Sequence, residues 1–397
     1  MSKLNFLVIF FFLFVYLFNL KISIPPNNLL ILTGLLGGGI FLLKLIKDVR
    51  CEKFFLQSFF VLLLIPFSWA ISCIVNGYYD FSYIKEIFLL NLIYLFSVYC
   101  FYYCFEKVDN DLLISLVGLV VFSQLLISFV AFISPSFFNF IFSIFIVDNL
   151  DSARLENFNE ARMIGVGKAF FGSGVVNCLT LILLAFQISK SQKYWYLNIF
   201  IYIGIAVLGM LSSRTTIVGI LLSAILLIKN PILVLKSFGF FSIILVLLFP
   251  LYNFLSGNNK FLILKDFGFS IFYDTENSQA TRSLETLKSM FEIYPNNLKT
   301  WLFGDVYYRS VTGTGSYYMG TDVGFIRVIF SVGILGLFFY ILSNVYFILS
   351  SEVFKNNKLI CIVFIILFFI LNFKGIANIY YFLILFLLFF KKSRRCD

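Results

Sequence analysis

The sequence predicts an all-α, polytopic integral membrane protein, and its composition carries that prediction. Of 397 residues, 61% are hydrophobic and only 13% are charged, whereas a soluble globular chain carries about 25% charged residues. Twelve transmembrane helices of about 20 residues would use about 60% of the chain. The composition therefore excludes a large soluble catalytic domain and predicts a single transmembrane domain over residues 1–397.

Twelve apolar runs, bounded by charged or turn residues, supply the predicted spans. They are Leu4–Leu20, Leu29–Ile46, Phe54–Val75, Ile87–Phe105, Leu112–Ile133, Phe170–Ile188, Trp195–Leu211, Thr215–Ile228, Phe238–Leu255, Phe325–Leu349, Leu359–Leu371 and Ile376–Phe390. The eighth and eleventh runs are short, and we interpret both as members of hairpin pairs because polar turn residues flank them. No small-residue cleavage site follows the first run, so we expect a retained helix rather than a signal peptide.

Basic residues in the short connections predict the orientation, because cytoplasmic loops carry the excess of Lys and Arg. They cluster after even-numbered spans and in the C-terminal tail: Lys44, Lys47, Arg50, Lys53, Lys190, Lys193, Lys229, Lys236, Lys355, Lys358, Lys391, Lys392, Arg394 and Arg395. All lie on one side of the membrane if both termini are cytoplasmic. Most of the net charge of +10 is thus a topology signal rather than evidence for nucleic-acid binding.

Two connections on the opposite, outer side are long, and long ordered loops on a rigid scaffold usually carry function. The loop over 134–169 contains Phe137–Val147, which is too short to span and is therefore interfacial or re-entrant. The loop over 257–322 contains Thr281–Tyr294, where apolar residues recur at helical spacing before Pro295. A tolerated, disordered insertion is the alternative interpretation of each loop.

The chain contains no His, which excludes Ser-His and Cys-His nucleophile pairs, His general bases and His metal ligands. We predict no cofactor and no metal. Six of the nine Arg are expected outside or at the outer membrane edge: Arg154, Arg162, Arg214, Arg282, Arg309 and Arg327. Arg matches phosphate oxygens in pairs, as Lys cannot, so this set would suit a phosphate-bearing lipid headgroup. Scattered surface Arg is the alternative.

Three outer residues have a more specific setting. Arg214 lies between two apolar runs with almost no loop, which favours a functional role because charge inside a membrane is costly. Arg327 lies three residues into the tenth span and could face a cavity or snorkel to water. Asp322 could act as a general base, orient an Arg or cap the tenth span.

Aromatic residues and one acidic pair leave further alternatives open. Trp301, Tyr307, Tyr308, Tyr317 and Tyr318 could stack on sugar faces or form the ordinary interfacial belt. On the cytoplasmic side, Asp109-Asn-Asp111 could hold a metal and a nucleotide diphosphate. We favour a helix N-terminus there, because the triplet opens the fifth span and no soluble domain accompanies it.

Four stretches between residues 162 and 336 resemble one known family. They are Arg162-Met-Ile-Gly-Val-Gly167 leading to a Gly-rich span with Asn177; Ser213-Arg-Thr215; Arg282 followed by Pro295 and Leu302-Phe-Gly-Asp305; and Asp322-Val-Gly-Phe-Ile with Gly333-Ile-Leu-Gly336. Their order resembles that in the O-antigen and capsule repeat-unit polymerases (the Wzy family), relatives of the O-antigen ligases. Ligases of this group carry a His where this chain has Thr321-Asp322, so the departure favours a polymerase.

The resemblance implies a GT-C-like bundle in the bacterial inner membrane. It implies a metal-independent enzyme that polymerises undecaprenyl pyrophosphate-linked oligosaccharide repeat units on the outer face. The implied partners are that lipid-linked oligosaccharide, the lipid bilayer and a chain-length regulator protein, with no nucleic acid. A lipid-linked oligosaccharide flippase, an O-antigen ligase and a non-enzymatic scaffold are the alternatives.

The resemblance and the charge pattern together give a set of candidate site residues. We expect Arg214, Arg162 and Asp322 to be catalytic, with the two Arg stabilising charge on the leaving pyrophosphate. We expect the substrate-binding residues to be Arg154, Lys168, Arg282, Arg309, Arg327, Tyr317 and Tyr318.

Overall fold

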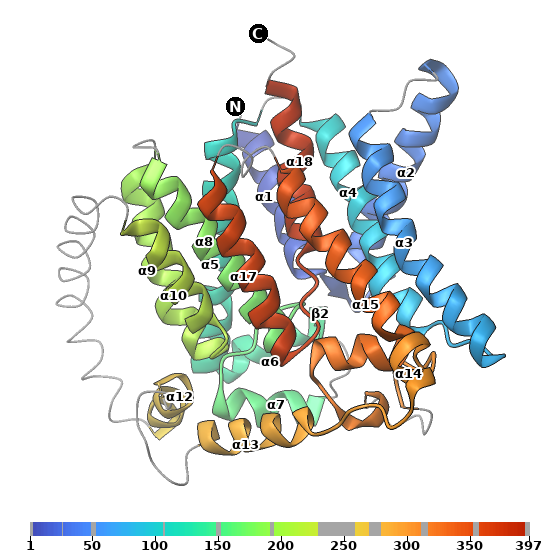
Figure 1. The fold of residues 1–397 in the computed structure, drawn as a ribbon. Coiled ribbons are helices and arrows are strands. Elements are labelled where there is room, and N and C mark those ends of the chain that lie inside the picture. The colour runs from blue at the N-terminus through green and yellow to red at the C-terminus, as the bar shows by residue number, and fades with distance from the viewer. Residues whose placement is uncertain are drawn as a thin grey trace. The chain divides into compact units, whose positions relative to one another are not determined.

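The computed structural model confirms the all-α class. It describes residues 3–25, 27–48, 53–105, 108–147, 152–190, 194–228, 259–269, 279–310, 317–351 and 357–393. Within these residues the chain forms 16 α-helices and one two-stranded sheet (Figure 1). The chain divides into two compact units: unit 1 comprises residues 1–29 and 108–282, and unit 2 comprises residues 30–107 and 283–397.

Seven helical segments in the described residues are long and apolar enough to cross a membrane, which supports a multi-pass membrane protein. They are Leu29–Lys47, Phe55–Asn76, Ile84–Cys104, Asn110–Ile133, Phe171–Lys190, Trp195–Ser212 and Gly324–Ser350. The shorter helices α1 (Lys3–Phe18), α10 (Thr216–Leu227), α17 (Lys358–Lys374) and α18 (Tyr380–Ser393) occupy other predicted spans. The run Phe238–Leu255 lies outside the described residues, so the total of twelve stays a prediction.

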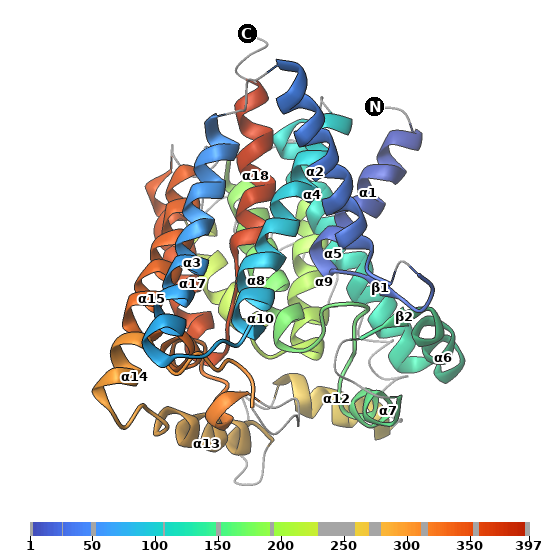
Figure 2. The same cartoon turned by 90° about the vertical axis from the view of Figure 1, so that its right-hand side faces the viewer.

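Unit 1 is built around α8 (Phe171–Lys190), whose middle is almost entirely buried. It packs against α5 (Asn110–Ile133), α9 (Trp195–Ser212) and α10. At one end of these helices lie α6 (Pro135–Ile144), α7 (Ser152–Ala161) and α12 (Asn259–Phe269) (Figures 1 and 2). Strand β1 (Lys21–Ile22) pairs antiparallel with β2 (Phe145–Ile146). Unit 1 therefore carries its loop-borne helices together at one end.

Both long loops contain helices where they are described. Helix α6 begins after Ser134, whose side chain accepts a hydrogen bond from the Phe137 backbone N–H, and Pro135 fits the first helical position. Helix α13 (Gln279–Phe291) confirms the amphipathic helix predicted over 281–294. Both loops thus contain ordered secondary structure rather than consisting only of irregular insertion.

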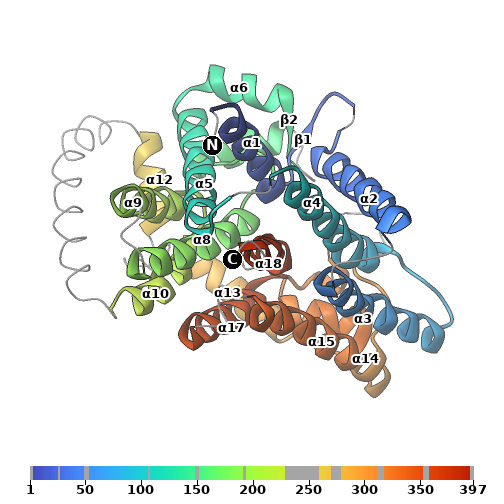
Figure 3. The same cartoon turned by 90° about the horizontal axis from the view of Figure 1, so that it is seen from above.

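Unit 2 contains α2 (Leu29–Asp48), α3 (Lys53–Asn76), α4 (Leu90–Cys104), α15 (Gly324–Ser350), α17 and α18. A π-helical turn, η1 (Ile84–Leu89), leads directly into α4. Helix α18 lies between α4 and α15 and contacts both (Figure 3). The short α14 (Leu298–Phe303) and the 3-10 turn η2 (Tyr318–Gly320) precede α15 in the chain. The segment before α15 therefore supplies two short helical elements.

Helix α15 is interrupted at Gly333, and the loop after α14 packs into the interruption. Gly333 has a φ of 70°, which a residue with a side chain adopts only at a cost. The backbone N–H groups of Asp305 and Val306 donate to the carbonyls of Phe330 and Ser331 over 2.6 and 3.0 Å. The loop thereby satisfies backbone carbonyls that a broken membrane helix would otherwise leave without partners.

Gly304 makes this close approach possible, which yields a first prediction. A Cβ at Gly304 would lie 2.5 Å from the backbone of Ser331, whereas a Cβ at Gly77 would meet nothing within 4 Å. Both glycines have a positive φ, so Gly77→Ala controls for the backbone strain of about 1–2 kcal/mol. We expect Gly304→Ala to lower stability by about 2 kcal/mol more than Gly77→Ala, measured as detergent-solubilised thermal unfolding. Equal losses would show that the packing at Gly333 contributes little.

Candidate functional site

The sequence segment that follows α7 positions Arg162 in unit 1. The Arg162 backbone N–H donates to the Phe158 carbonyl, closing the last turn of α7. The next residues, Met163, Ile164 and Val166, are buried, and the carbonyl of Val166 accepts from the Gln124 side chain over 2.8 Å. Burial of these apolar side chains and the hydrogen bond from Gln124 of α5 thus fix the chain immediately after Arg162.

The tight connection between α9 and α10 positions Arg214. The Thr216 and Ile217 backbone N–H groups donate to the carbonyls of Ser213 and Arg214, over 3.0 and 3.1 Å, so the second helix starts within the turn. Helix α8 approaches this turn closely, because a Cβ at Gly174 would lie 2.5 Å from Ser213 Oγ. The Gly-rich entry to α8 and the Ser-Arg-Thr turn are therefore packed against each other.

Helix α12 lies in the second long loop, and its Phe267 contacts both Arg162 and Arg214. The Arg214 Cζ lies 4.6 Å and the Arg162 Cζ 5.7 Å from the centroid of the Phe267 ring. Arg214 Nε also donates to the Phe267 carbonyl over 2.8 Å. Arg162 stacks in addition on Phe170 and Phe158, at 3.7 and 4.9 Å. We call this group (Arg162, Arg214, Phe267, Phe158 and Phe170) the arginine pair site.

The two guanidinium groups act on each other electrostatically. Burial and, to a lesser extent, the nearby positive charge of Arg214 together lower the pKa of Arg162 to about 10. Burial also lowers the pKa of Arg214, whose Nη2 is buried without a hydrogen-bond partner among the described residues. In the described part of the chain, no carboxylate forms an ion pair with either guanidinium. At neutral pH the site is thus a cationic pair that presents donors to an anion.

Lys168 adds a third basic side chain to this part of unit 1. Its backbone N–H donates to the Phe18 carbonyl over 2.9 Å, and its ammonium group is buried. Burial holds the pKa of Lys168 well below its usual value. Arg154 and Arg282 lie on α7 and α13, but their side chains are outside the described part of the structure. Lys168 therefore lies on the same short connection to α8 as Arg162.

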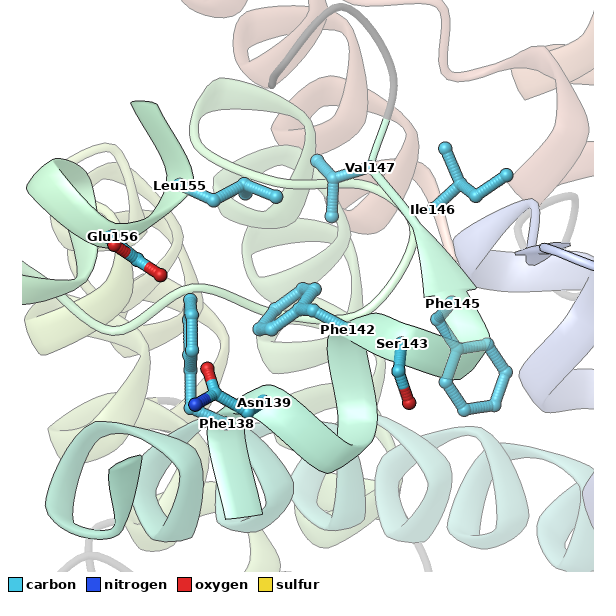
Figure 4. A pocket seen from close by; sticks show the side chains of 9 residues that line it. All are labelled: Phe138, Asn139, Phe142, Ser143, Phe145, Ile146, Val147, Leu155 and Glu156. Atoms are coloured by element: carbon cyan, nitrogen blue, oxygen red, sulfur yellow. The ribbon is translucent and has the colours of Figure 1, made fainter. Parts of the chain in front are cut away.

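A cavity of about 330 Å³ lies between α6 and α7 (Figure 4). It is lined by Phe138, Asn139, Phe142, Ser143, Phe145, Ile146, Val147, Leu155 and Glu156. Phe138, Val147 and Leu155 also belong to a buried cluster against which Phe170 packs. The wall of the cavity is therefore continuous with the aromatic ring on which Arg162 stacks.

Unit 2 holds a second cluster, centred on Tyr308. Arg327, in the first turn of α15, is only 6% exposed, and its Cζ lies 3.4 Å from the Tyr317 ring centroid and 4.4 Å from that of Tyr308. Its Nε and Nη2 are buried and have no hydrogen-bond partner among the described residues. Arg327 is therefore buried within the protein and does not snorkel to water. We call the following group the tyrosine cluster: Tyr308, Arg327, Tyr317, Arg309, Tyr78, Tyr307 and Tyr318.

Arg309 forms an ion pair with Glu86, which we did not predict as a site residue. Arg309 Nε donates to Glu86 Oε1 over 2.6 Å, and Arg309 Nη2 also contacts that oxygen. Glu86 lies on η1, and π-helical turns inside α-helices occur frequently at functional sites. The sequence held one sign of this role: Glu86 is an acidic residue directly before the predicted span Ile87–Phe105. The pair joins the loop after α14 to the start of the α4 span.

Tyrosines and carboxylates complete the tyrosine cluster. The ring of Tyr307 packs between those of Tyr78 and Tyr318, with centroids 4.8 and 5.3 Å apart and the ring planes tilted by 35° and 34°. The Tyr318 hydroxyl donates to Asp305 Oδ2 over 3.3 Å, and burial raises the pKa of Tyr318. The Tyr308 backbone N–H donates to Asp80 Oδ2 over 3.3 Å. Burial also raises the pKa of Tyr308, and the charges of Arg327, Glu86 and Arg309 act on its hydroxyl.

Asp322 lies at the surface of the same unit, just before α15. It does not cap the helix, because the N-cap residue is Val323, which makes no side-chain cap bond. Thr321 Oγ1 instead accepts from the Val323 N–H over 3.3 Å. Loss of water raises the pKa of Asp322, and Arg327 opposes that shift. The capping role considered for Asp322 is therefore wrong, and its carboxylate is available for other interactions.

The structure brings together some of the predicted residues and adds others. Arg162 and Arg214 meet at one ring, and Arg309, Arg327, Tyr317 and Tyr318 belong to one cluster. The triplet Asp109-Asn-Asp111 opens α5, with Asp109 as its N-cap. Within the described ranges, no three His, Cys, Asp or Glu side chains are grouped to hold a metal ion. Sequence reasoning missed Phe267, Glu86 and Asp305.

Comparisons with protein-family models, with curated proteins and with solved structures found no match for this chain. The proposed function therefore rests on the chemistry of the arginine pair site and the tyrosine cluster.

The arginine pair site predicts specific stabilisation by a divalent oxyanion. We expect sodium sulfate to raise the apparent melting temperature of the detergent-solubilised protein beyond the effect of sodium chloride at equal ionic strength. Arg214→Gln should bind sulfate at least about tenfold more weakly, because it loses a charge-assisted hydrogen-bond donor. Lys299→Gln, which removes an exposed charge on α14, serves as the control. An unchanged sulfate response in Arg214→Gln would contradict an anion site at this residue.

The pKa of Arg162 predicts the pH range of that binding. The pKa of Arg162 in the folded protein is about 10, below the usual 12.5. Arg162 therefore loses its proton at a lower pH in the folded protein than in the unfolded chain. Sulfate affinity should therefore be constant from about pH 7 to pH 9 and fall above about pH 10. The fall should be absent in Arg162→Gln, measured by the same thermal shift. A decline already complete by pH 8 would mean that another group controls binding.

Proposed function

We propose that the protein polymerises polyprenyl pyrophosphate-linked oligosaccharide repeat units on the outer face of a bacterial inner membrane, with both termini cytoplasmic. The observation that supports this most strongly is the arginine pair site. Arg162 and Arg214 come from different loops, share one aromatic ring and form no ion pair with a described carboxylate. Such a site suits the phosphate oxygens of a lipid pyrophosphate.

The reaction transfers the growing chain from its lipid to the next unit. A hydroxyl oxygen of the incoming unit forms a bond to the anomeric carbon of the growing chain. The bond between that carbon and the pyrophosphate oxygen breaks, and polyprenyl pyrophosphate leaves with the electron pair. Oriented guanidinium donors stabilise the negative charge that develops on the leaving group. The hydroxyl proton needs an acceptor, and Asp322 stays our candidate for that role.

The position of the charges favours a polymerase over a lipid-linked oligosaccharide flippase. A flippase needs charged residues along the membrane depth of its transport path. Arg162, Lys168 and Arg214 instead lie on connections between helices, and Arg327 lies in the first turn of a span. A site that binds phosphate at one end of a unit is the arrangement that a surface transfer reaction requires.

A ligase remains the nearest enzymatic alternative. Ligases of the resembling group carry a His at the position of Thr321-Asp322, and this chain has none. Asp322 is not the N-cap residue of α15, so its carboxylate has no capping role there. The missing His therefore favours the polymerase.

Deletion of the coding sequence separates these functions. If the protein is the polymerase, surface glycan should persist as single repeat units while the ladder of longer chains disappears, as read from a gel of the extracted glycolipid. Accumulation of lipid-linked units on the cytoplasmic face would support the flippase instead. Normal-length polymer retained on its lipid carrier would support the ligase.

Arg214→Lys tests the pyrophosphate site within the proposed reaction. Lysine keeps the positive charge but loses the paired donors and the stacking on Phe267. We expect polymerisation to fall by about 100-fold or more, the usual effect of removing one transition-state donor, so that the ladder shortens or vanishes. The control Lys299→Gln should give the wild-type ladder. A wild-type ladder from normally expressed Arg214→Lys would remove Arg214 from the catalytic site.

A further inference from the structure

The tyrosine cluster contains a buried positive group with unused hydrogen-bond donors. Arg327 is 6% exposed, yet its Nε and Nη2 have no hydrogen-bond partner in the part of the chain that the structure describes. Its planar face is covered by Tyr317 and Tyr308, so only the edges of the guanidinium group can receive a ligand. A buried donor without a partner costs free energy. The ligand of this site must therefore accept hydrogen bonds.

The surroundings of Arg327 are rich in carboxylates, unlike the arginine pair site. Glu86 is paired with Arg309, so that cation is already neutralised. Asp80 and Asp305 each accept hydrogen bonds from the tyrosine cluster. The positive charge of Arg327 acts on the carboxyl group of Asp322, which lies just before α15. These carboxylates would repel a pyrophosphate, which bears several negative charges and offers only acceptors.

Sugar hydroxyl groups match this mixture, because each hydroxyl both donates and accepts a hydrogen bond. They can accept from Arg327 and donate to carboxylate oxygens, and the rings of the tyrosine cluster offer flat amphipathic surfaces. We propose that the tyrosine cluster of unit 2 binds an uncharged segment of a glycan through its hydroxyl groups, and not a lipid pyrophosphate. This inference rests on the proposed function and decides which part of the substrate Arg327 contacts.

Direct binding to the full-length protein in lipid nanodiscs tests this assignment without any polymerisation step. One probe is an oligosaccharide of one repeat unit, prepared by partial hydrolysis of the surface polysaccharide of the host. The other probe is inorganic pyrophosphate. Titration calorimetry on the wild type should detect both probes. Oligosaccharide affinity should change less than about twofold between 0.05 and 0.5 M salt, because an uncharged ligand is insensitive to screening.

The variants assign each probe to its site. Arg327→Lys and Asp322→Asn should each weaken oligosaccharide binding at least tenfold and leave pyrophosphate binding within twofold. Arg214→Gln should do the reverse, and Lys299→Gln should change neither. Asp322 is at the surface, so Asp322→Asn decides the matter if Arg327→Lys fails to fold.

Two results would overturn the proposal. If Arg327→Lys or Asp322→Asn changes pyrophosphate affinity tenfold, the tyrosine cluster is a phosphate site. If folded variants bind both probes as the wild type does, or if the wild type does not bind the oligosaccharide, the cluster has only a structural role. Failure of the proposed function is seen separately, as a persistent polymer ladder in the deletion strain, and does not alter the binding measurement.

Discussion

A guanidinium group that leaves water must gain replacement partners, because it keeps its charge at neutral pH and an unpaired buried charge is costly. In both clusters the partner is an aromatic face. Arg162 and Arg214 share the ring of Phe267, which fixes the planes of both groups without neutralising them. Arg327 stacks on Tyr317 and Tyr308, but there carboxylates lie close by. We base the separate assignments to phosphate and to sugar on this difference in neutralisation.

Irregular backbone at the ends of the spans positions these side chains, and it requires unusual residues. The turn that presents Arg214 is packed against Gly174, which leaves room for no side chain. The loop that presents Tyr307 and Tyr308 is anchored where α15 is interrupted at Gly333, by hydrogen bonds to carbonyls of that helix. Non-helical backbone at membrane depth needs such internal partners, so the same interactions that hold the spans together also build the clusters.

Much of the fold could be predicted from the sequence, because apolar runs and loop lengths are local properties. The all-α class, the helix within 281–294 and the helix-opening role of Asp109 all follow from periodicity and capping. The sequence also indicated Arg162, Arg214 and Arg327, since charge beside an apolar run is rare. It could not indicate Phe267, because one ring among 55 Phe residues carries no signal until α12 packs beside α9. Glu86 and Asp305 acquire roles only through partners distant in the chain.

The central claim is that the protein joins lipid-linked units and releases their lipid pyrophosphate. The most direct measurement uses the purified protein in liposomes with polyprenyl pyrophosphate-linked repeat units as the sole substrate. Glycan chain length and free polyprenyl pyrophosphate would be followed together by mass spectrometry. The account predicts that one polyprenyl pyrophosphate is released for each glycosidic bond formed. Movement of intact units between the leaflets without bond formation or release of the lipid pyrophosphate would contradict it.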